Sequence, residues 1–322
     1  MITKKILITG ASGFIGSAIL IRLNKLNFTV RSISGKSILE SQLKFDRLDN
    51  FINKSIGSKI NWAELLSDVS CIIHCAGKYS DNKQENNTLL FYRKSNVELT
   101  SDLAKQAAFF GVKRFIFLST IGVNSLFLEK SKSFSINDTP KLVDKYQISK
   151  WEAEQVLLEI SKQTGLETVI IRPPLVYGEN QKGKFLNLLN LVYNRIPLPF
   201  DKFDNLKSFI NIENLVDLII KCIDNPNVSG KTLFVSDGED ISIPDLIRKL
   251  SKLMKKSPRI FSLPVPIIKL IFSLFNKKTY IDKLICPSQI DNSYACEVLK
   301  WKPVISLDKG LEKTVNWYLK NR

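Results

Sequence analysis

Tyr146 and Lys150 lie four residues apart at the start of a stretch, 146–164, whose apolar spacing is typical of a helix. A separation of four places both side chains on one helix face, one turn apart. A free tyrosine has a pKa of about 10, and a neighbouring ammonium stabilises the phenolate and lowers that pKa toward the working range. The pair is therefore a candidate general acid/base with the cation that tunes it. An amphipathic helix that carries Tyr and Lys by chance is the alternative.

Two hydroxyl side chains, Ser119 and Thr120, stand at the end of a strand predicted over 115–119. Open α/β sheets bind their ligands at the carboxyl ends of the strands. One hydroxyl can therefore hydrogen-bond a substrate oxygen beside Tyr146, while the other satisfies backbone groups at the strand end. We expect Thr120 to take the catalytic place.

Residues 9–16 read Thr-Gly-Ala-Ser-Gly-Phe-Ile-Gly, between a predicted strand and a predicted helix. Gly10 permits the sharp turn, Gly13 the close approach of a pyrophosphate, and Gly16 the tight packing of helix on strand. The helix N-terminus adds free N–H groups and the positive end of the helix dipole. A simple turn with spare glycines is the alternative. The loop predicts a bound dinucleotide, held by Gly10, Ser12, Gly13, Phe14, Ile15 and Gly16.

The choice between NAD and NADP depends on the end of the second predicted strand. Sites that prefer NAD usually place a carboxylate there, which holds the ribose hydroxyl and repels the additional phosphate of NADP. Here Ser34 takes that position, and Arg31 and Lys36 are near it in the sequence. We therefore expect all three residues to contact the cofactor and NADP(H) to be favoured, with NAD(H) as the alternative. Both basic residues could equally be solvated surface charges.

Strand-like apolar runs alternate with helical patterns through the first half of the chain, which is the rhythm of parallel βαβ units. The predicted strands cover 6–9, 28–33, 71–75, 115–119 and 167–171, and the predicted helices cover 14–26, 97–110 and 146–164. Further on, prolines punctuate shorter elements, which indicates a smaller lobe. We therefore predict an α/β fold: a Rossmann doubly wound parallel sheet over 1–174, with 209–235 returning to it, and a smaller, mixed C-terminal substrate-binding lobe over 175–208 and 236–322.

Composition argues against several classes of protein. Hydrophobic residues make up 44% of the 322 residues, yet no apolar run is suited to a signal peptide or a membrane span. The five cysteines form no CxxC pair and His74 is the single histidine, so we expect no metal site and a reducing compartment, the cytoplasm. The net charge is +16, but the lysines are dispersed and no nucleic-acid-binding signature accompanies them. We expect no nucleic-acid partner, since an anionic small-molecule substrate is enough to explain the charge.

One apolar stretch, 261–275, is followed by Lys277 and Lys278. A helix of this kind can lie in a membrane interface, which makes peripheral membrane contact through 261–278 one interpretation. Packing on the substrate lobe or at a subunit contact is the interpretation we favour.

The motifs together resemble those of the extended short-chain dehydrogenase/reductases, over nearly the whole chain and in the right order. They are Thr-Gly-Ala-Ser-Gly-Phe-Ile-Gly (9–16), Ile-His-Cys-Ala-Gly (73–77), Leu-Ser-Thr (118–120), Tyr-x-x-Ser-Lys (146–150) and Arg-Pro-Pro-Leu-Val-Tyr-Gly (172–178). The likeness is to the NAD(P)-dependent epimerase/dehydratase branch that acts on nucleotide sugars. Within it, 115–124 and 235–240 resemble 4-keto-sugar reductases of the UDP-N-acetylquinovosamine type, whose relatives often carry the name UDP-glucose 4-epimerase. The resemblance implies a homodimer.

The resemblance also implies roles for single residues. Thr120 would be the hydroxyl partner of the substrate, Tyr146 the general acid/base, and Lys150 the lysine that binds the nicotinamide ribose. Asn96 matches an asparagine under the active site with a structural or water-relay role. Lys207 falls where relatives often use Arg for the substrate diphosphate, and a lysine offers a point charge rather than a bidentate fork. Further matches are Ala76 and Pro173 at the cofactor, Leu175 where many relatives have Asn, and Trp301 as a packing anchor.

The function that this resemblance implies is NADPH-dependent reduction at C4 of a UDP-4-keto-6-deoxy-N-acetylhexosamine for surface polysaccharide synthesis. The UDP-sugar substrate would contact Thr120, Tyr146 and Lys207. A UDP-glucose or UDP-N-acetylglucosamine 4-epimerase with bound NAD is one alternative. A dinucleotide-binding regulator without catalytic activity is the other, and the intact Tyr146 and Lys150 pair disfavours it.

Overall fold

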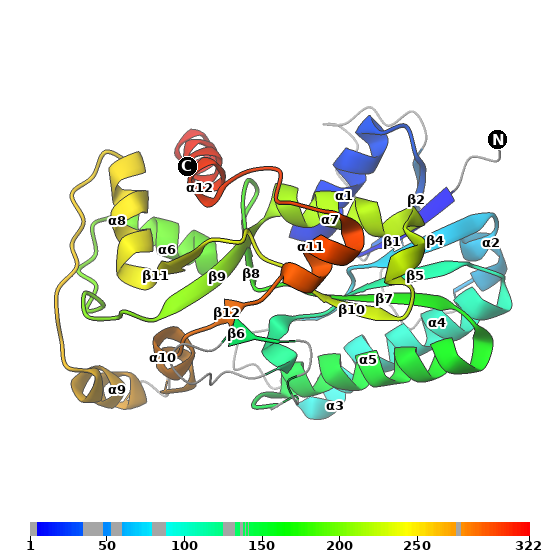
Figure 1. Ribbon diagram of the computed structural model, residues 1–322, viewed down its shortest axis with the longest axis horizontal. Coiled ribbons are helices and arrows are strands. Elements are labelled where there is room, and N and C mark those ends of the chain that lie inside the picture. The colour runs from blue at the N-terminus through cyan, green and yellow to red at the C-terminus, as the bar shows by residue number, and fades with distance from the viewer. Residues whose placement is uncertain are drawn as a thin grey trace.

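A seven-stranded parallel sheet forms the centre of the computed structural model, with the order β10-β7-β5-β4-β1-β2-β3 (Figure 1). The structure describes residues 5–34, 48–52, 60–78, 88–124, 133–135, 138, 140, 142–274 and 278–322. Within these residues the predicted doubly wound Rossmann sheet is confirmed. Its strands are β1 (Lys5–Thr9), β2 (Thr29–Ser34), β3 (Leu48–Ile52), β4 (Val69–His74), β5 (Arg114–Leu118), β7 (Glu167–Arg172) and β10 (Lys231–Phe234).

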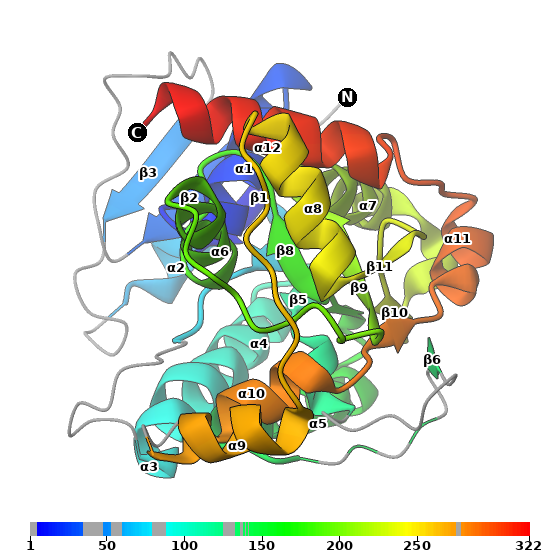
Figure 2. The same cartoon turned by 90° about the vertical axis from the view of Figure 1, so that its left-hand side faces the viewer.

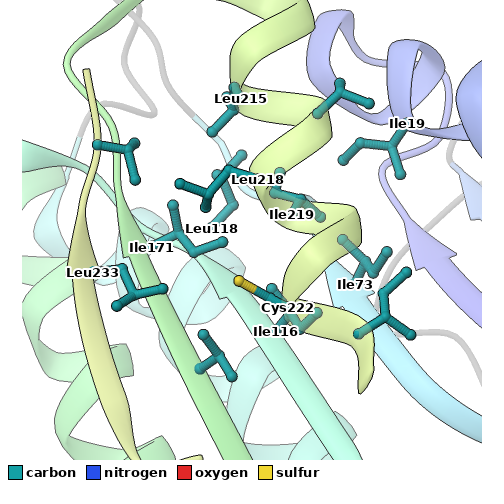
Figure 3. Packing of buried hydrophobic residues seen from close by; sticks show 14 of the residues in the cluster. Ile19, Ile73, Ile116, Leu118, Ile171, Leu215, Leu218, Ile219, Cys222 and Leu233 are labelled. Atoms are coloured by element: carbon teal, nitrogen blue, oxygen red, sulfur yellow. The ribbon is translucent and has the colours of Figure 1, made fainter. Parts of the chain in front are cut away.

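Helices cover both faces of this sheet, which explains why its strands are apolar runs rather than alternating patterns. Ile6 and Ile8 of β1 belong to the apolar cluster beneath α1 (Phe14–Lys25) and α7 (Ile212–Asp224), and the intervening Leu7 belongs to the cluster on the other face. Figure 3 shows side chains of α7 over those of β5, β7 and β10. The opposite face is covered by α2 (Trp62–Leu66), α4 (Leu99–Phe109) and α5 (Lys145–Thr164).

A third apolar cluster lies around a three-stranded sheet with the order β11-β9-β8. The strands are β8 (Leu175–Tyr177), β9 (Leu206–Asn211) and β11 (Asp240–Ser242), and β12 (Gln289–Ile290) pairs with β6 (Ser133–Phe134). The apolar cluster beneath α1 and α7 also draws on residues beyond 174, because α7 packs on the large sheet and β10 is one of its strands. The exact division of the chain into two domains stays a prediction. The remaining helices are α6 (Lys184–Tyr193), α8 (Ile243–Leu253), α9 (Val265–Leu274), α10 (Lys278–Ile285), α11 (Ser293–Leu299) and α12 (Leu307–Lys320) (Figure 2).

A buried polar network joins the second sheet to the helices around it. Asp237 accepts hydrogen bonds from Tyr177 Oη at 2.8 Å, from Asn214 Nδ2 at 2.7 Å and from the Asn211 backbone N–H at 2.8 Å. A Cβ added at Gly310 of α12 would lie 2.5 Å from Tyr177 Oη, so only glycine lets the helix approach so closely. Every acceptor and donor here is paired, which fixes β8 and β9 beside α7. No helix in the described part of the chain is long and apolar enough to cross a bilayer.

Candidate active site

The glycine loop after β1 is packed too closely for larger residues. Gly10 has a φ of 71°, and a Cβ there would lie 2.8 Å from the backbone nitrogen of Ala76. A Cβ at Gly16 would lie 2.2 Å from Gly10 O, so α1 and β1 approach as the motif predicts. Gly13 is the N-cap of α1, without a side-chain cap, and the first turn of the helix has no acidic residue. The helix N-terminus therefore offers N–H donors and no repelling charge, which fits a dinucleotide pyrophosphate.

A small apolar pocket lies beside this loop, between the carboxyl ends of β2 and β4. Its lining is apolar apart from three buried polar side chains, those of Thr9, Ser34 and His74. His74 stays neutral here because burial, and then the Lys150 charge, lower its pKa to about 3. The pocket is lined by Thr9, Ile33, Ser34, Ile60, Trp62, Leu65, His74, Ala76, Leu99 and Leu103.

The Arg31 side chain, which the sequence predicts as a cofactor contact, donates hydrogen bonds to the end of α2. Its side chain is only 6% exposed, and Nη1 donates to the carbonyl oxygens of Glu64, Leu65 and Ser67 at 2.7, 3.0 and 3.0 Å. These carbonyls close the C-terminal end of α2, where a cation is favourable. Arg31 is therefore not a solvated surface charge, and its contact with the cofactor stays a prediction. Lys36 lies outside the described residues.

Helix α5 begins at a capping box that places the Tyr146 and Lys150 turn. Asp144 accepts from the Gln147 N–H at 2.8 Å, and Gln147 Oε1 accepts from the Asp144 N–H at 3.2 Å. Lys150 Nζ donates to Leu118 O at 2.8 Å, which ties the helix to the end of β5. The helix start and the carboxyl edge of the sheet therefore meet where the sequence predicts them to meet.

Burial controls the ionisation of both members of the pair. It lowers the pKa of Lys150 to about 8, against the opposing charges of Glu154 and Cys75. Burial also raises the pKa of Tyr146, followed by the effects of Asp144 and Tyr92. The expected lowering of the Tyr146 pKa is therefore not seen in this structure, where desolvation of the phenolate is the largest effect and raises the pKa. Tyr146 keeps its proton at neutral pH.

Thr120 stands directly after β5, as the N-cap of a short 3-10 helix over Ile121–Val123. Its Oγ1 accepts from the Gly122 N–H at 3.1 Å, so this bond does not commit the hydroxyl proton. Pro173 is close by, because its carbonyl accepts from the Ile121 N–H at 3.0 Å. The neighbouring Ser119 Oγ is buried and has no hydrogen-bond partner among the described residues. Both hydroxyls at this strand end thus have capacity for a ligand.

Asn96 connects the segment that follows β4 to α5. It lies in a π-helical segment, Arg93–Glu98, which continues α3 (Leu89–Tyr92). Its Nδ2 donates to Ser149 Oγ at 2.9 Å, and its Oδ1 accepts from the Lys78 N–H at 2.8 Å. The structure thus supports a structural role. The sequence analysis quoted Ser149 within its motif but gave it no role, and it missed Tyr92, whose ring centroid is 6.2 Å from that of Tyr146.

Lys207 lies on β9, apart from the residues above. It is 8% exposed, and its Nζ donates to the carbonyl of Cys286, with Ser288 Oγ 3.5 Å away. Burial lowers its pKa to about 8, and Cys286 opposes that shift. Leu175, at the start of β8, is 41% exposed and offers no polar group. Trp301 is buried, with its indole N–H donating to Asp217 at 3.0 Å, as a packing anchor does.

Comparisons with known proteins agree with this geometry. Residues 6–236 match the model of the NAD dependent epimerase/dehydratase family. A UDP-glucose 4-epimerase of Vibrio cholerae is 37% identical over an alignment of 322 positions, which covers 98% of this chain and 96% of that protein. An undecaprenol-linked N-acetylglucosamine 4-epimerase of Escherichia coli O157:H7 is 24% identical, over 81% of this chain and 76% of that protein. Among solved structures, UDP-glucuronic acid 4-epimerase from Bacillus cereus, with UDP-glucuronic acid and NAD, superimposes with a TM-score of 0.81 at 24% identity, covering 99% of this chain and 100% of the other.

Proposed function

This chain belongs to the NAD dependent epimerase/dehydratase family, and we propose that within it the enzyme reduces C4 of a UDP-4-keto-6-deoxy-N-acetylhexosamine. It is an enzyme of the extended short-chain dehydrogenase/reductase type with a nicotinamide dinucleotide cofactor. The observation that supports the proposal is the hydrogen bond from Lys150 Nζ to Leu118 O, which fixes the start of α5 to the end of β5, two residues before Thr120.

The nicotinamide, when bound, would supply the hydride. Tyr146 would donate the proton to the oxygen that develops at C4, and its raised pKa keeps that proton on the phenol until the negative charge appears. The Thr120 hydroxyl would donate a second hydrogen bond to the same oxygen. Lys150, charged below a pH of about 8, would bind the nicotinamide ribose and favour the phenolate left after the transfer.

The UDP moiety would lie against β9. Lys207 is the buried cation of that strand, and its ammonium can neutralise part of the diphosphate charge. Burial makes such a contact stronger than it would be in water, because the surrounding dielectric is lower.

The proposed preference for NADPH depends on Ser34. It is buried at the carboxyl end of β2 and lines the apolar pocket, where no carboxylate would repel an additional phosphate. Arg31 gives no support to this preference, since its guanidinium is engaged with α2. The contribution of Lys36 stays a prediction.

A 4-epimerase is the second candidate, and the names of the relatives favour it. The Vibrio cholerae relative carries that name at 37% identity over nearly the whole chain. An epimerase would use the same residues and return the hydride to its substrate, so it would show no net use of cofactor.

One experiment separates the two. The purified enzyme is incubated with NADPH and UDP-4-keto-6-deoxy-N-acetylglucosamine, and in parallel with UDP-glucose or UDP-N-acetylglucosamine without added cofactor. Stoichiometric oxidation of NADPH with formation of the 4-hydroxy sugar is the expected result. Interconversion of the 4-epimers without net NADPH use, and with NAD retained through purification, would establish the epimerase instead.

A further inference from the structure

Helix α9 (Val265–Leu274) presents an apolar stripe to the outside of the molecule. Ile267, Leu270, Ile271 and Leu274 are 45%, 63%, 41% and 76% exposed. Their spacing of i, i+3, i+4 and i+7 puts the four side chains on one helix face. This set is named the α9 stripe below. Four aliphatic side chains in one row exceed the scattered exposure that is normal for a protein surface.

The opposite face of α9 is firmly packed. Ile268 is fully buried in the C-terminal apolar cluster, and Phe272 packs against the same cluster. Lys269 Nζ lies 3.0 Å from Asp282 Oδ1, which joins α9 to α10. The helix is therefore apolar on two faces: the inner face packs on the protein, and the outer face is exposed.

The surroundings of the α9 stripe add cations and more apolar surface. In both views α3 lies on the same side of the molecule as α9 (Figures 1 and 2). Leu90 of α3 is 72% exposed, and Arg93 and Lys94 are exposed one turn further on, with the Arg93 guanidinium paired with Glu152. Apolar side chains next to cations are the composition of a surface that contacts lipid head groups and acyl chains together.

We propose that the α9 stripe docks into the surface of an anionic phospholipid bilayer, with the helix lying in the plane of the interface. The charge of the chain decides between this partner and a second copy. At +16 per chain, two copies repel each other, whereas an anionic surface attracts each of them. The α9 stripe also lacks the Tyr, Trp and Arg side chains that are typical of protein–protein contacts.

Docking in this way would bring one wall of the candidate active site near the lipid. α10 follows α9, and the carbonyl of Cys286 at its end accepts from Lys207. Lys207, the predicted diphosphate-binding residue, thus contacts the chain at the end of α10, the helix that follows α9. The bilayer contact itself does not depend on which sugar nucleotide the enzyme uses.

Cosedimentation of the full chain with vesicles tests the proposal. The wild type should bind vesicles of phosphatidylcholine with phosphatidylglycerol, bind phosphatidylcholine vesicles less, and lose affinity as salt rises. The double variant Leu270→Ser/Leu274→Ser should bind the anionic vesicles about ten-fold or more weakly, since two leucine side chains no longer leave water. Leu26→Ser/Leu319→Ser is the matched control, because both leucines are about 40% exposed but belong to the ends of α1 and α12 on the opposite side (Figure 1).

A second measurement locates the contact. Tryptophan in Leu270→Trp should be quenched by brominated lipids, and tryptophan in Leu319→Trp should not. Binding that persists unchanged in the α9 double variant would overturn the proposal, as would no binding of the wild type to anionic vesicles. A wild-type dimer in sedimentation velocity that dissociates in the α9 double variant would show that a second copy covers the α9 stripe instead.

Discussion

Replacing Lys207 by Ala tests the proposed diphosphate contact without touching the reacting atoms. The ammonium is almost fully buried on β9 and donates to the carbonyl of Cys286. Two functions are therefore conceivable for it: binding a phosphate or holding the 286–288 segment against β9. These functions predict different results for ligand affinity and its pH dependence.

The magnitude follows from the kind of contact. A hydrogen bond to a charged group contributes about 1.5–3 kcal/mol, and each 1.4 kcal/mol is about ten-fold in affinity. The Kd for UDP should therefore rise by about ten-fold to about 150-fold in Lys207→Ala. The cofactor Kd should stay nearly unchanged, since Lys207 belongs to the second sheet and the glycine loop to the first.

The lowered pKa of Lys207 adds a sharper signature. Burial places it at about 8, so the ammonium loses its proton as the pH rises through that value. The wild-type affinity for UDP should then fall with rising pH, by up to about ten-fold per pH unit above the pKa. The affinity of Lys207→Ala should be flat over the same range.

Isothermal titration of UDP between about pH 7 and about pH 10 measures both effects. Lys202→Ala is the matched control, because Lys202 is exposed and only five residues away in the same lobe. Equal UDP affinity in wild type and Lys207→Ala would refute the contact. A weaker affinity in Lys207→Ala, together with a pH-independent wild type and a lowered thermal midpoint, would assign Lys207 to the 286–288 segment alone.

Four further substitutions test the rest of the site. Tyr146→Phe should lower kcat by about 10²–10⁴-fold, with the cofactor Kd unchanged in equilibrium binding, because only the proton donor is lost; wild-type-like kcat would contradict the role. Lys150→Met should also raise the cofactor Kd, and an unchanged value would remove its ribose contact. Ser34→Asp should shift the ratio of kcat/KM from NADPH toward NADH, because a carboxylate repels the additional phosphate; an unchanged ratio would place that phosphate elsewhere. The folded protein lowers the pKa of His74 from 6.5 to about 3, so below pH 6.5 the unfolded state takes up a proton that the folded state does not. The free energy of unfolding should therefore fall by up to about 1.4 kcal/mol per pH unit. Urea unfolding of wild type and His74→Gln across that range measures it, and equal pH slopes would count against it.

The features that sequence alone predicted are those whose cause is local. The glycine loop requires a positive φ at Gly10 and no Cβ at Gly16, and both needs appear directly as glycines at fixed spacing. The α5 turn that carries Tyr146 and Lys150 begins at a capping box, which is also a short-range pattern. Parallel strands bring the ends of β1 and β5 to one edge by topology, so Thr120 follows from strand order.

Features that depend on distant contacts were beyond the sequence. Arg31 is read easily as a cofactor ligand because it stands near Ser34, yet its carbonyl partners come from α2, more than thirty residues later. Asn96 lies in a π-helix, which no propensity distinguishes from the α-helix around it. The Tyr146 pKa depends on total burial, and a sequence lists the nearby charge of Lys150 but not the loss of water.

That last difference bears on the direction of the reaction. A reductase starts with a neutral tyrosine that gives its proton to C4 oxygen, whereas an epimerase starts by taking a proton from the C4 hydroxyl. Burial leaves Tyr146 protonated, and it makes Lys150 readier to lose its proton than a free lysine is. The Lys150 shift also limits the pH range, since above about pH 8 the cation that would stabilise the phenolate is lost. The names of the relatives favour epimerisation, and the NADPH balance decides between the two reactions.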